Sequence, residues 1–472
     1  MRRILFSVIL SLTLSHPLRA QQQIEGAWEG AIGVMGALFN IRVQFAVSGD
    51  ALKGTIDIPQ QGARGLPLQN VRVEGVKVHF ELAAGPGLAT FDGEIGDEGI
   101  KGSFLQSGVS GTFSLQRAVT ARTAPAETSA PPPYKEEEVR FFNDKVELAG
   151  TLTLPPAAGP HPAVIMISGS GAQNRDEEIF GFKPFRIIAD HLTRKGVAVL
   201  RYDDRGVGGS TGNLALATID DFAGDVLAAL KFLQGHAAID ARGIGLCGHS
   251  EGGLVAGLVA SRSSEISFVI LMAGTSVPGD AVILSQVEVL ARAGGVPDTE
   301  IQRKLKLQQR VYQVVRAGEG WDQMVEDLRQ EARATVEKLP PQQRQSLGDV
   351  EAMIDRALKP QLAALRTPWF RSFIDFDPAT ALKQVRCPVL GLFGELDTQV
   401  TVAQNKEPLE RALQEAGNKD HTIHIFPKTN HLFIPATTGL PAEYPTLKKE
   451  FVSGFLDLVS DWILQRVRTS RE

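Results

Sequence analysis

Two hydrophobic patterns divide the chain, and the first covers residues 24–117. Apolar and polar positions alternate there in short runs, as at residues 39–45 and 71–74, and Gly and Asp turns separate the runs. Successive side chains of a strand point to opposite faces of a sheet, so this alternation is typical of strands with one buried face. Short strands at a spacing of roughly 8 to 12 residues predict a small antiparallel β barrel or sandwich.

The second pattern begins near residue 138, where uninterrupted apolar runs alternate with helical stretches. Strands that are apolar on both faces belong to a parallel sheet with helices on each side. Their alternation with helices predicts a doubly wound α/β domain over residues 138–472. The apolar runs lie at residues 163–167, 197–202, 244–247, 268–272, 389–393 and 422–426.

This alternation stops between residues 273 and 388. The chain is helical in pattern and rich in charge there, for example at residues 300–316 and 321–339. A helical insertion of this size is uncommon as a simple connection between two strands. We therefore predict a helical cap over the functional site at about residues 276–382.

Two further segments have a composition of their own. Residues 118–137 are rich in Ala, Thr and Pro and end in charged residues, which predicts a linker. At the N-terminus, two arginines precede an apolar run at residues 4–14, which is the pattern of a signal peptide at residues 1–20. The run is shorter than the roughly 20 residues of a membrane span. We expect an exported protein, periplasmic or secreted, with no stable membrane span.

Charge and cysteine content bear on the class of function. The 49 Lys and Arg residues are outnumbered by 54 Asp and Glu residues, and the net charge is −5. No basic run stands out, so a nucleic-acid partner is not expected. No cluster of Cys and His has the spacing of metal ligands, and we expect no metal and no cofactor. The oligomeric state remains open.

The strongest chemical motif is G-x-S-x-G at residues 248–252, with Ser250 at its centre. It follows the apolar run 244–247 directly and leads into a helix of small residues. This strand-turn-helix context is that of a nucleophile elbow, in which a tight turn holds the serine out over the sheet edge. The glycines on either side avoid collision with the strand and the helix. Ser250 is therefore the predicted nucleophile.

Two similar motifs lack the right context. A second G-x-S-x-G surrounds Ser210, eight residues past the run ending at residue 202, and no helix follows it. The glycines at 243, 245 and 248 spell G-x-G-x-x-G, the fingerprint of dinucleotide binding. That fingerprint must lie in the turn after a strand, whereas the apolar positions 244 and 246 place these glycines within one. Both motifs are expected to be structural.

A serine nucleophile needs a base that takes its proton and a carboxylate that orients the base. Glu395 and Asp397 both follow the apolar run 389–393, and either is a candidate acid. His431 is the candidate base, because it alone among nine histidines follows the last apolar run in a loop. Active-site residues of α/β domains lie at such strand ends.

The tetrahedral intermediate needs two N–H donors for its oxyanion. One is expected from Glu251, the residue after the nucleophile, and the other from the loop at residues 168–171. Ser170 is the preferred second donor, with Gly171 beside it. In the cap, Trp369 and Phe370 are candidates for the lining of an acyl pocket. The alternative that they pack in the core of the cap stays open, since aromatic side chains mostly pack.

Residues 138–468 resemble the α/β-hydrolase superfamily, and most closely its bacterial esterase branch of serine-aminopeptidase-like and dienelactone-hydrolase-like proteins. The resemblance implies an α/β-hydrolase fold with Ser250 as nucleophile, Asp397 rather than Glu395 as acid, and His431 as base. Many relatives begin the oxyanion loop with His-Gly where this chain has Ser168 and Gly169, so the second donor stays open. The motifs that carry the resemblance lie at residues 167–171, 201–206, 248–253, 394–400 and 430–431.

The residues and the resemblance together predict a serine hydrolase that cleaves small-molecule carboxylic esters of short to medium acyl chain through a covalent acyl-enzyme. A serine peptidase with the same triad is the alternative, and a ligand-binding protein with an inactive hydrolase domain is a third reading. In this fold a strand separates those that carry Cys247 and Cys387, which puts them roughly 9 to 10 Å apart. A disulfide tolerates about 7 Å between Cα atoms. We expect two buried free thiols.

Overall fold

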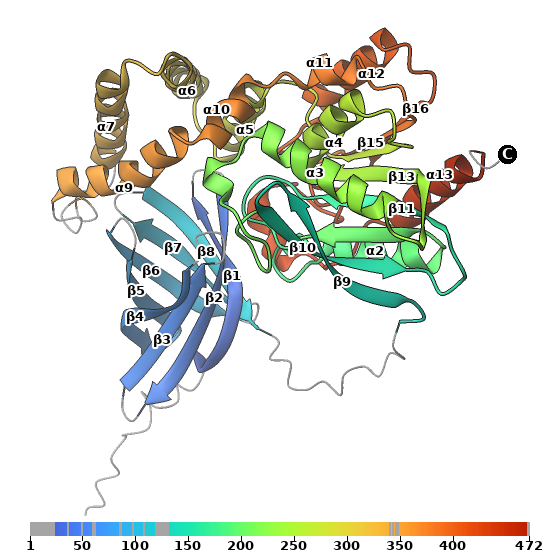
Figure 1. Cartoon of the computed structure of the whole chain (residues 1–472). Helices are drawn as coiled ribbons and strands as arrows, with labels where there is room; N and C mark the ends of the chain where they lie inside the picture. Colours follow the sequence, from blue (N-terminus) through green and yellow to red (C-terminus); the bar gives the residue numbers. More distant parts are fainter. Residues whose placement is uncertain are drawn as a thin grey trace, which may run out of the picture. The chain divides into compact units, whose positions relative to one another are not determined.

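The computed structural model describes residues 24–34, 37–48, 51–58, 63–84, 87–96, 99–106, 109–118, 132–338, 341, 344 and 349–469. They form two compact units, one all-β and one α/β (Figure 1). The predicted signal peptide at residues 1–20 and linker residues 119–131 lie outside the described residues.

The first unit is a closed antiparallel barrel of eight strands in sequence order, with β1 paired to β8 (Figure 1). A barrel, rather than a sandwich, is therefore the form that the alternating pattern takes. The strands are β1 (Gly26–Val34), β2 (Ala37–Ser48), β3 (Ala51–Ile58), β4 (Ala63–Glu74), β5 (Lys77–Ala84), β6 (Gly87–Gly96), β7 (Gly99–Gln106) and β8 (Val109–Arg117).

Alternate side chains of these strands build the barrel core. Along β5, Val78, Phe80 and Leu82 are buried, whereas the residues between them are half-buried. The rings of Phe80 and Phe91 stack with their centroids 4.5 Å apart. Side chains fill the interior of a small barrel, and this cluster of aromatic and aliphatic groups does so here.

The second unit is built on an eight-stranded sheet in the order β16-β15-β14-β13-β11-β12-β10-β9. The strands from β11 to β16 run parallel, and β9 and β10 are antiparallel additions at one edge. This confirms the predicted α/β fold. The strands are β9 (Lys135–Asn143), β10 (Val146–Leu154), β11 (His161–Ile167), β12 (Ala198–Tyr202), β13 (Ile239–His249), β14 (Val269–Met272), β15 (Val389–Gly394) and β16 (His421–Phe426).

Strands β9 and β10 have no counterpart among the apolar runs of the sequence. Every residue of β11 is buried, but β9 lies at the sheet edge and exposes Lys135, Glu136 and Glu138. Charged side chains are common on edge strands because they discourage pairing with other chains. Strand β9 therefore begins at Lys135, inside the segment 118–137 expected to be a linker, since composition alone does not separate a charged edge strand from a linker.

Helices cover both faces of the sheet. Helices α3 and α4 contact each other on one face, and α2 and α13 contact each other on the other (Figure 1). The helices in these two layers are α2 (Pro184–Arg194), α3 (Ile219–Gln234), α4 (Glu251–Arg262), α12 (Val402–Glu415) and α13 (Phe455–Thr469). In the part of the chain that is described, no helix is both long and apolar enough to cross a membrane.

A helical insertion joins β14 to β15, as the sequence predicts. Near its C-terminal end, the short helix α10 (Pro368–Asp375) contacts α3, α5 (Gly279–Ala293) and the short helix η2 (Leu214–Leu216), so the end of the insertion packs against α3. The inserted helices are α5 (Gly279–Ala293), α6 (Asp298–Ala317), α7 (Trp321–Glu337), α9 (Val350–Leu365), α10 (Pro368–Asp375) and α11 (Pro378–Leu382).

Both cysteines are free thiols, which confirms the prediction of no disulfide. Strand β14 lies between β13, which carries Cys247, and β15, which begins two residues after Cys387. Cys247 is buried, but Cys387 is only partly buried because it precedes the paired residues of its strand. The expectation that both thiols are buried is therefore wrong for Cys387.

Candidate active site

Ser250 stands on a sharp turn between β13 and α4. Its backbone angles are φ 54° and ψ −117°, a conformation that residues other than glycine rarely adopt. A Cβ atom at Gly248 would lie 2.0 Å from the carbonyl oxygen of Gly252, and one at Gly252 would lie 2.2 Å from that of Ile167. The two motif glycines are therefore required for the turn. Ser250 itself is half-buried between buried neighbours.

Asp397 and His431 lie in contact after the ends of β15 and β16. The Nδ1 atom of His431 is 2.7 Å from Oδ2 of Asp397, and both residues are 4% exposed. The other carboxylate oxygen of Asp397 accepts the N–H groups of Gln399 and Val400 at 2.7 and 2.9 Å. These bonds fix the carboxylate, and the carboxylate in turn fixes the tautomer and orientation of the imidazole.

Glu395 has a different environment from Asp397. It is exposed, and its Oε2 atom accepts the N–H of Lys428 at 2.8 Å. Of the two candidate acids, the one in contact with His431 is Asp397.

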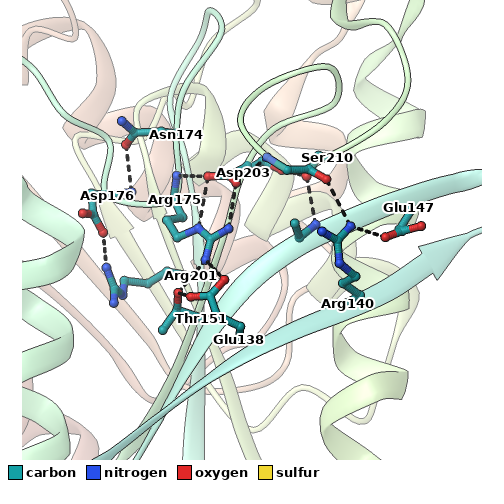
Figure 2. Close-up of polar contacts among 12 residues, drawn as sticks. Glu138, Arg140, Glu147, Thr151, Asn174, Arg175, Asp176, Arg201, Asp203 and Ser210 are labelled. Carbon is teal, nitrogen blue, oxygen red and sulfur yellow. Dashed lines mark hydrogen bonds and ion pairs between the residues drawn. The ribbon is translucent and has the colours of Figure 1, made fainter.

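Ser210 and the glycine-rich segment of β13 have structural roles. The Ser210 hydroxyl donates to the carbonyl of Asp203 at 2.7 Å and accepts the N–H of Ala149 at 2.9 Å, inside the contact network of Figure 2. Gly245 lies within β13, where a Cβ atom would come 2.2 Å from the ring of Phe268. The glycines thus lie within a strand, as predicted, and not in the turn that dinucleotide binding needs.

The loop after β11 lies against the elbow. A Cβ atom at Gly169 would be 3.2 Å from Cβ of Ser250. The N–H of Gly169 already donates to Oε1 of Glu177 at 2.6 Å. Among the described residues, the N–H groups of Ser170 and Glu251 have no protein acceptor. These two N–H groups are therefore free to bind a ligand oxygen.

A cavity adjoins the elbow, and its walls come from the loop after β11, from α4 and from the cap. Gly171, Glu251 and Trp369 line it, together with Ser168 and Asp204. The Nε1 atom of Trp369 donates to Oε1 of Glu251 at 2.8 Å. Burial raises the pKa of the Glu251 carboxyl to about 7, against the lowering effect of that hydrogen bond. The cap thus reaches the elbow through helix α10.

Phe370 does not line this cavity. It is buried and packs beside the ring of Tyr312 at a centroid distance of 6.3 Å. Of the two cap aromatics predicted from the sequence, Trp369 lies in the cavity wall, and Phe370 takes the alternative role in the core of the cap.

A comparison with family models matches residues 164–438 to the alpha/beta hydrolase family. The chain belongs to the α/β hydrolase family. A curated relative, Esterase EstD of Thermotoga maritima, is 25% identical over 361 residues, which cover 76% of this hydrolase and 74% of the relative.

Solved structures similar to this hydrolase include an esterase and a proline iminopeptidase. Esterase Pf2001 of Pyrococcus furiosus is 15% identical, with a TM-score of 0.42 and a match over 70% of this chain and 91% of that one. A proline iminopeptidase of Mycobacterium smegmatis is 17% identical, with a TM-score of 0.42 and a match over 71% of this chain and 100% of that one.

A pair of residues that the sequence analysis missed lies beneath the elbow of the hydrolase. The Nδ1 atom of His249 is 2.9 Å from Oε1 of Glu177, and its Nε2 atom is 3.0 Å from the carbonyl oxygen of His431. Burial alone lowers the pKa of His249, but the Glu177 carboxylate outweighs it, and the pKa is raised. His249 adjoins the nucleophile in sequence, but Glu177 has no sequence signal because its contact is made only on folding.

An arginine fixes the loop that carries Glu177 to the sheet of the hydrolase (Figure 2). The guanidinium of Arg175 bonds both carboxylate oxygens of Asp203, at 3.2 and 2.9 Å. It also donates to Glu138 of β9 at 2.7 Å and to Thr151 of β10 at 2.6 Å. Burial raises the pKa of Asp203, but hydrogen bonds from Arg175 outweigh it and hold the pKa below its usual range. The edge strands thus support the loop that lines the site.

The remaining question about the site is whether side chains within the described ranges could hold a metal ion. No group of three or more His, Cys, Asp or Glu side chains is arranged there to hold a metal ion.

Proposed function

We propose that this α/β hydrolase is a serine esterase that acts on small-molecule carboxylic esters through Ser250, Asp397 and His431. The observation that carries the proposal is the buried 2.7 Å contact between Asp397, in the loop after β15, and His431, in the loop after β16. The carbonyl of His431 is bonded to His249, the neighbour of Ser250, at 3.0 Å. These contacts support the proposed roles of Ser250 as nucleophile, His431 as base and Asp397 as acid.

The proposed reaction has two steps. The Ser250 hydroxyl oxygen attacks the ester carbonyl carbon while Nε2 of His431 takes the hydroxyl proton. The resulting oxyanion accepts the N–H groups of Ser170 and Glu251, and it collapses as the alcohol leaves with the proton from His431. Water then gives a proton to His431 and attacks the acyl-enzyme, and the acid is released as Ser250 regains its proton.

Support for an ester substrate comes from the relative from Thermotoga maritima, which is named an esterase. The same triad chemistry serves amides as well as esters. Hydrolysis of short-chain esters is therefore to be measured beside that of dipeptide amides, and faster cleavage of the amides would replace esterase by peptidase in the proposal.

The decisive experiment compares the wild type with Ser250→Ala. We expect the wild type to hydrolyse p-nitrophenyl acetate and butyrate and to be labelled by a fluorophosphonate probe, and the variant to lose both. Ser210→Ala is the matched control, because Ser210 lies in the second G-x-S-x-G motif, and it should retain labelling. Equal activity in Ser250→Ala and wild type would refute the assignment of Ser250.

We also propose that the protein is exported, because two arginines and an apolar run precede residue 20. Expression of the full chain should yield a periplasmic or secreted form that lacks about 20 N-terminal residues. The mass of the purified protein measures this, and an intact N-terminus on cytoplasmic protein would contradict it.

A further inference from the structure

The Glu177–His249 pair has a geometry that restricts where its protons lie. Both ring nitrogens of His249 face oxygen atoms, Oε1 of Glu177 at 2.9 Å and the carbonyl of His431 at 3.0 Å. A backbone carbonyl only accepts, so Nε2 of His249 carries a proton. A neutral imidazole has one N–H and is then an acceptor at Nδ1. The remaining proton of the pair lies either on Nδ1 of His249 or on Glu177.

The relative basicity of the two groups decides between these states. Histidine binds a proton about two pKa units more tightly than glutamate in water. The N–H of Gly169 donates to the same oxygen of Glu177 at 2.6 Å, so this oxygen acts as an acceptor toward the oxyanion loop as well. The side chains of His249 and Glu177 are 5% and 2% exposed, so water does not come between the imidazole and the carboxylate. The pair is therefore an imidazolium beside a carboxylate.

This ion pair joins three segments of the site. Glu177 holds the oxyanion loop through the N–H of Gly169, and His249 directly precedes the nucleophile and holds the carbonyl of His431. The rings of His249 and His431 have centroids 4.6 Å apart. We propose that Glu177 and His249 are positioning residues, a buried imidazolium–carboxylate pair that clamps the oxyanion loop and the His431 loop to the elbow. The proposal rests on the proposed function of Ser250.

Three other ionisable groups lie near Glu177 and His249, but none of them takes the place of Glu177 as the ion-pair partner of His249. Asp397 lies across the ring of His431, and its charge also favours protonated His249. Asp204 and Cys247 lie near Glu177, and burial together with the Glu177 charge raises the pKa of both groups. The carboxylate oxygens of Asp204 accept hydrogen bonds from the Ser168 hydroxyl at 2.6 Å and from the N–H of Gln173 at 2.9 Å, so its hydrogen-bond partners lie outside the pair. The ion-pair partner of His249 is Glu177.

The backbone at Glu177 agrees with a role in positioning. Its φ angle is +50°, in the left-handed region that non-glycine residues rarely occupy. Such a conformation persists only where surrounding contacts hold it. The contacts here are those of its own carboxylate and the neighbouring Arg175 clamp on Asp203.

The first test uses Glu177→Gln and His249→Gln, which keep side-chain size and remove the charge. Neither residue lines the cavity, so KM for p-nitrophenyl butyrate should stay within about twofold. The kcat should fall by about 100-fold, the size expected when reacting groups shift by about 1 Å. The double variant should lose no more than either single variant, because the two side chains act as one unit.

The chain offers a matched control pair. His236 and Glu137 form a histidine–glutamate contact of 3.3 Å, after the end of α3 and within β9. His236→Gln and Glu137→Gln should leave kcat unchanged. A wild-type kcat in Glu177→Gln or His249→Gln, even with a lower Tm, would overturn the proposal, since a purely structural contact changes stability alone.

The second test does not depend on turnover. Nitrogen-15 NMR of histidine-labelled protein near neutral pH should show His249 protonated at both nitrogens in the wild type, with its resonance assigned by loss in His249→Gln. In Glu177→Gln it should become neutral. A neutral His249 in the wild type overturns the proposal. If the wild type neither turns over nor labels, the esterase proposal fails, and the protonation of His249 still decides whether the charged pair exists.

Discussion

Replacement of Glu251 by glutamine tests how the charge of one buried carboxyl group beside the elbow affects the stability of the protein. In the wild type, Nε1 of Trp369 donates to Oε1 of Glu251 at 2.8 Å. The side-chain oxygen of glutamine can accept the same hydrogen bond, and glutamine fills nearly the same volume as glutamate. The variant differs from the wild type mainly in its inability to ionise. Any pH dependence of the difference in stability therefore reports on the charge of Glu251.

The expected magnitude follows from the pKa of Glu251. Burial raises that pKa from 4.5 to about 7 in a residue that is 5% exposed. At about 1.4 kcal/mol for each pH unit, the difference corresponds to about 3 kcal/mol. The folded state binds the proton more tightly than the unfolded state, so this stabilisation is complete below pH 4.5. It is lost as the pH rises through 7, where the wild type has a buried negative charge.

Thermal unfolding of both proteins at pH 5 and pH 8.5 measures the effect. The Tm of Glu251→Gln relative to the wild type should rise between these values by on the order of 5 °C. Glu407→Gln is the control, because Glu407 is exposed and pairs with Arg411 on the surface of α12, and such pairs contribute little. A Tm difference for Glu251→Gln that is the same at both pH values would refute the reasoning.

Three further outcomes are expected. Asp397→Asn should lower kcat by about 10⁴-fold because the imidazole of His431 loses its orienting carboxylate, whereas Glu395→Gln should stay within about twofold in the same ester assay. Gly252→Ala should fail to yield folded protein, since its Cβ atom would lie 2.2 Å from a backbone oxygen, and a wild-type Tm would contradict this. Mass spectrometry should find two alkylated thiols after unfolding without a reductant, and Cys247 unmodified in the folded protein, since it is buried.

The sequence predicts those features that depend on neighbouring residues. Alternating apolar positions such as Val78, Phe80 and Leu82 already determine which face of β5 is buried. The elbow is recognisable because Gly248 and Gly252 must flank Ser250 at fixed spacing for steric reasons. Local patterns of this kind need no knowledge of the folded chain.

Features that arise from contacts between distant segments were missed. Strand β9 exposes charged residues and acquires its role only by pairing with β10. The bond between Glu177 and His249 joins residues 72 positions apart, and no periodicity marks a pair that is created by tertiary packing. The residues alone leave Asp397 and Glu395 open because both lie in one loop, the family resemblance favours Asp397, and in the fold it is Asp397 that contacts His431.

The helical insertion leaves the sheet at the end of β14 and returns to it at the start of β15, and these two strands are direct neighbours with Val269 opposite Val389. The first and last residues of the helical insertion are therefore held in place by the pairing of β14 with β15 and not by the inserted helices. The length and sequence of the insertion can change without any shift of register between the two strands. We therefore expect that a different helical segment grafted between β14 and β15 would change the cavity wall that Trp369 contributes. Strands β13, β15 and β16, which precede Ser250, Asp397 and His431, would keep their alignment.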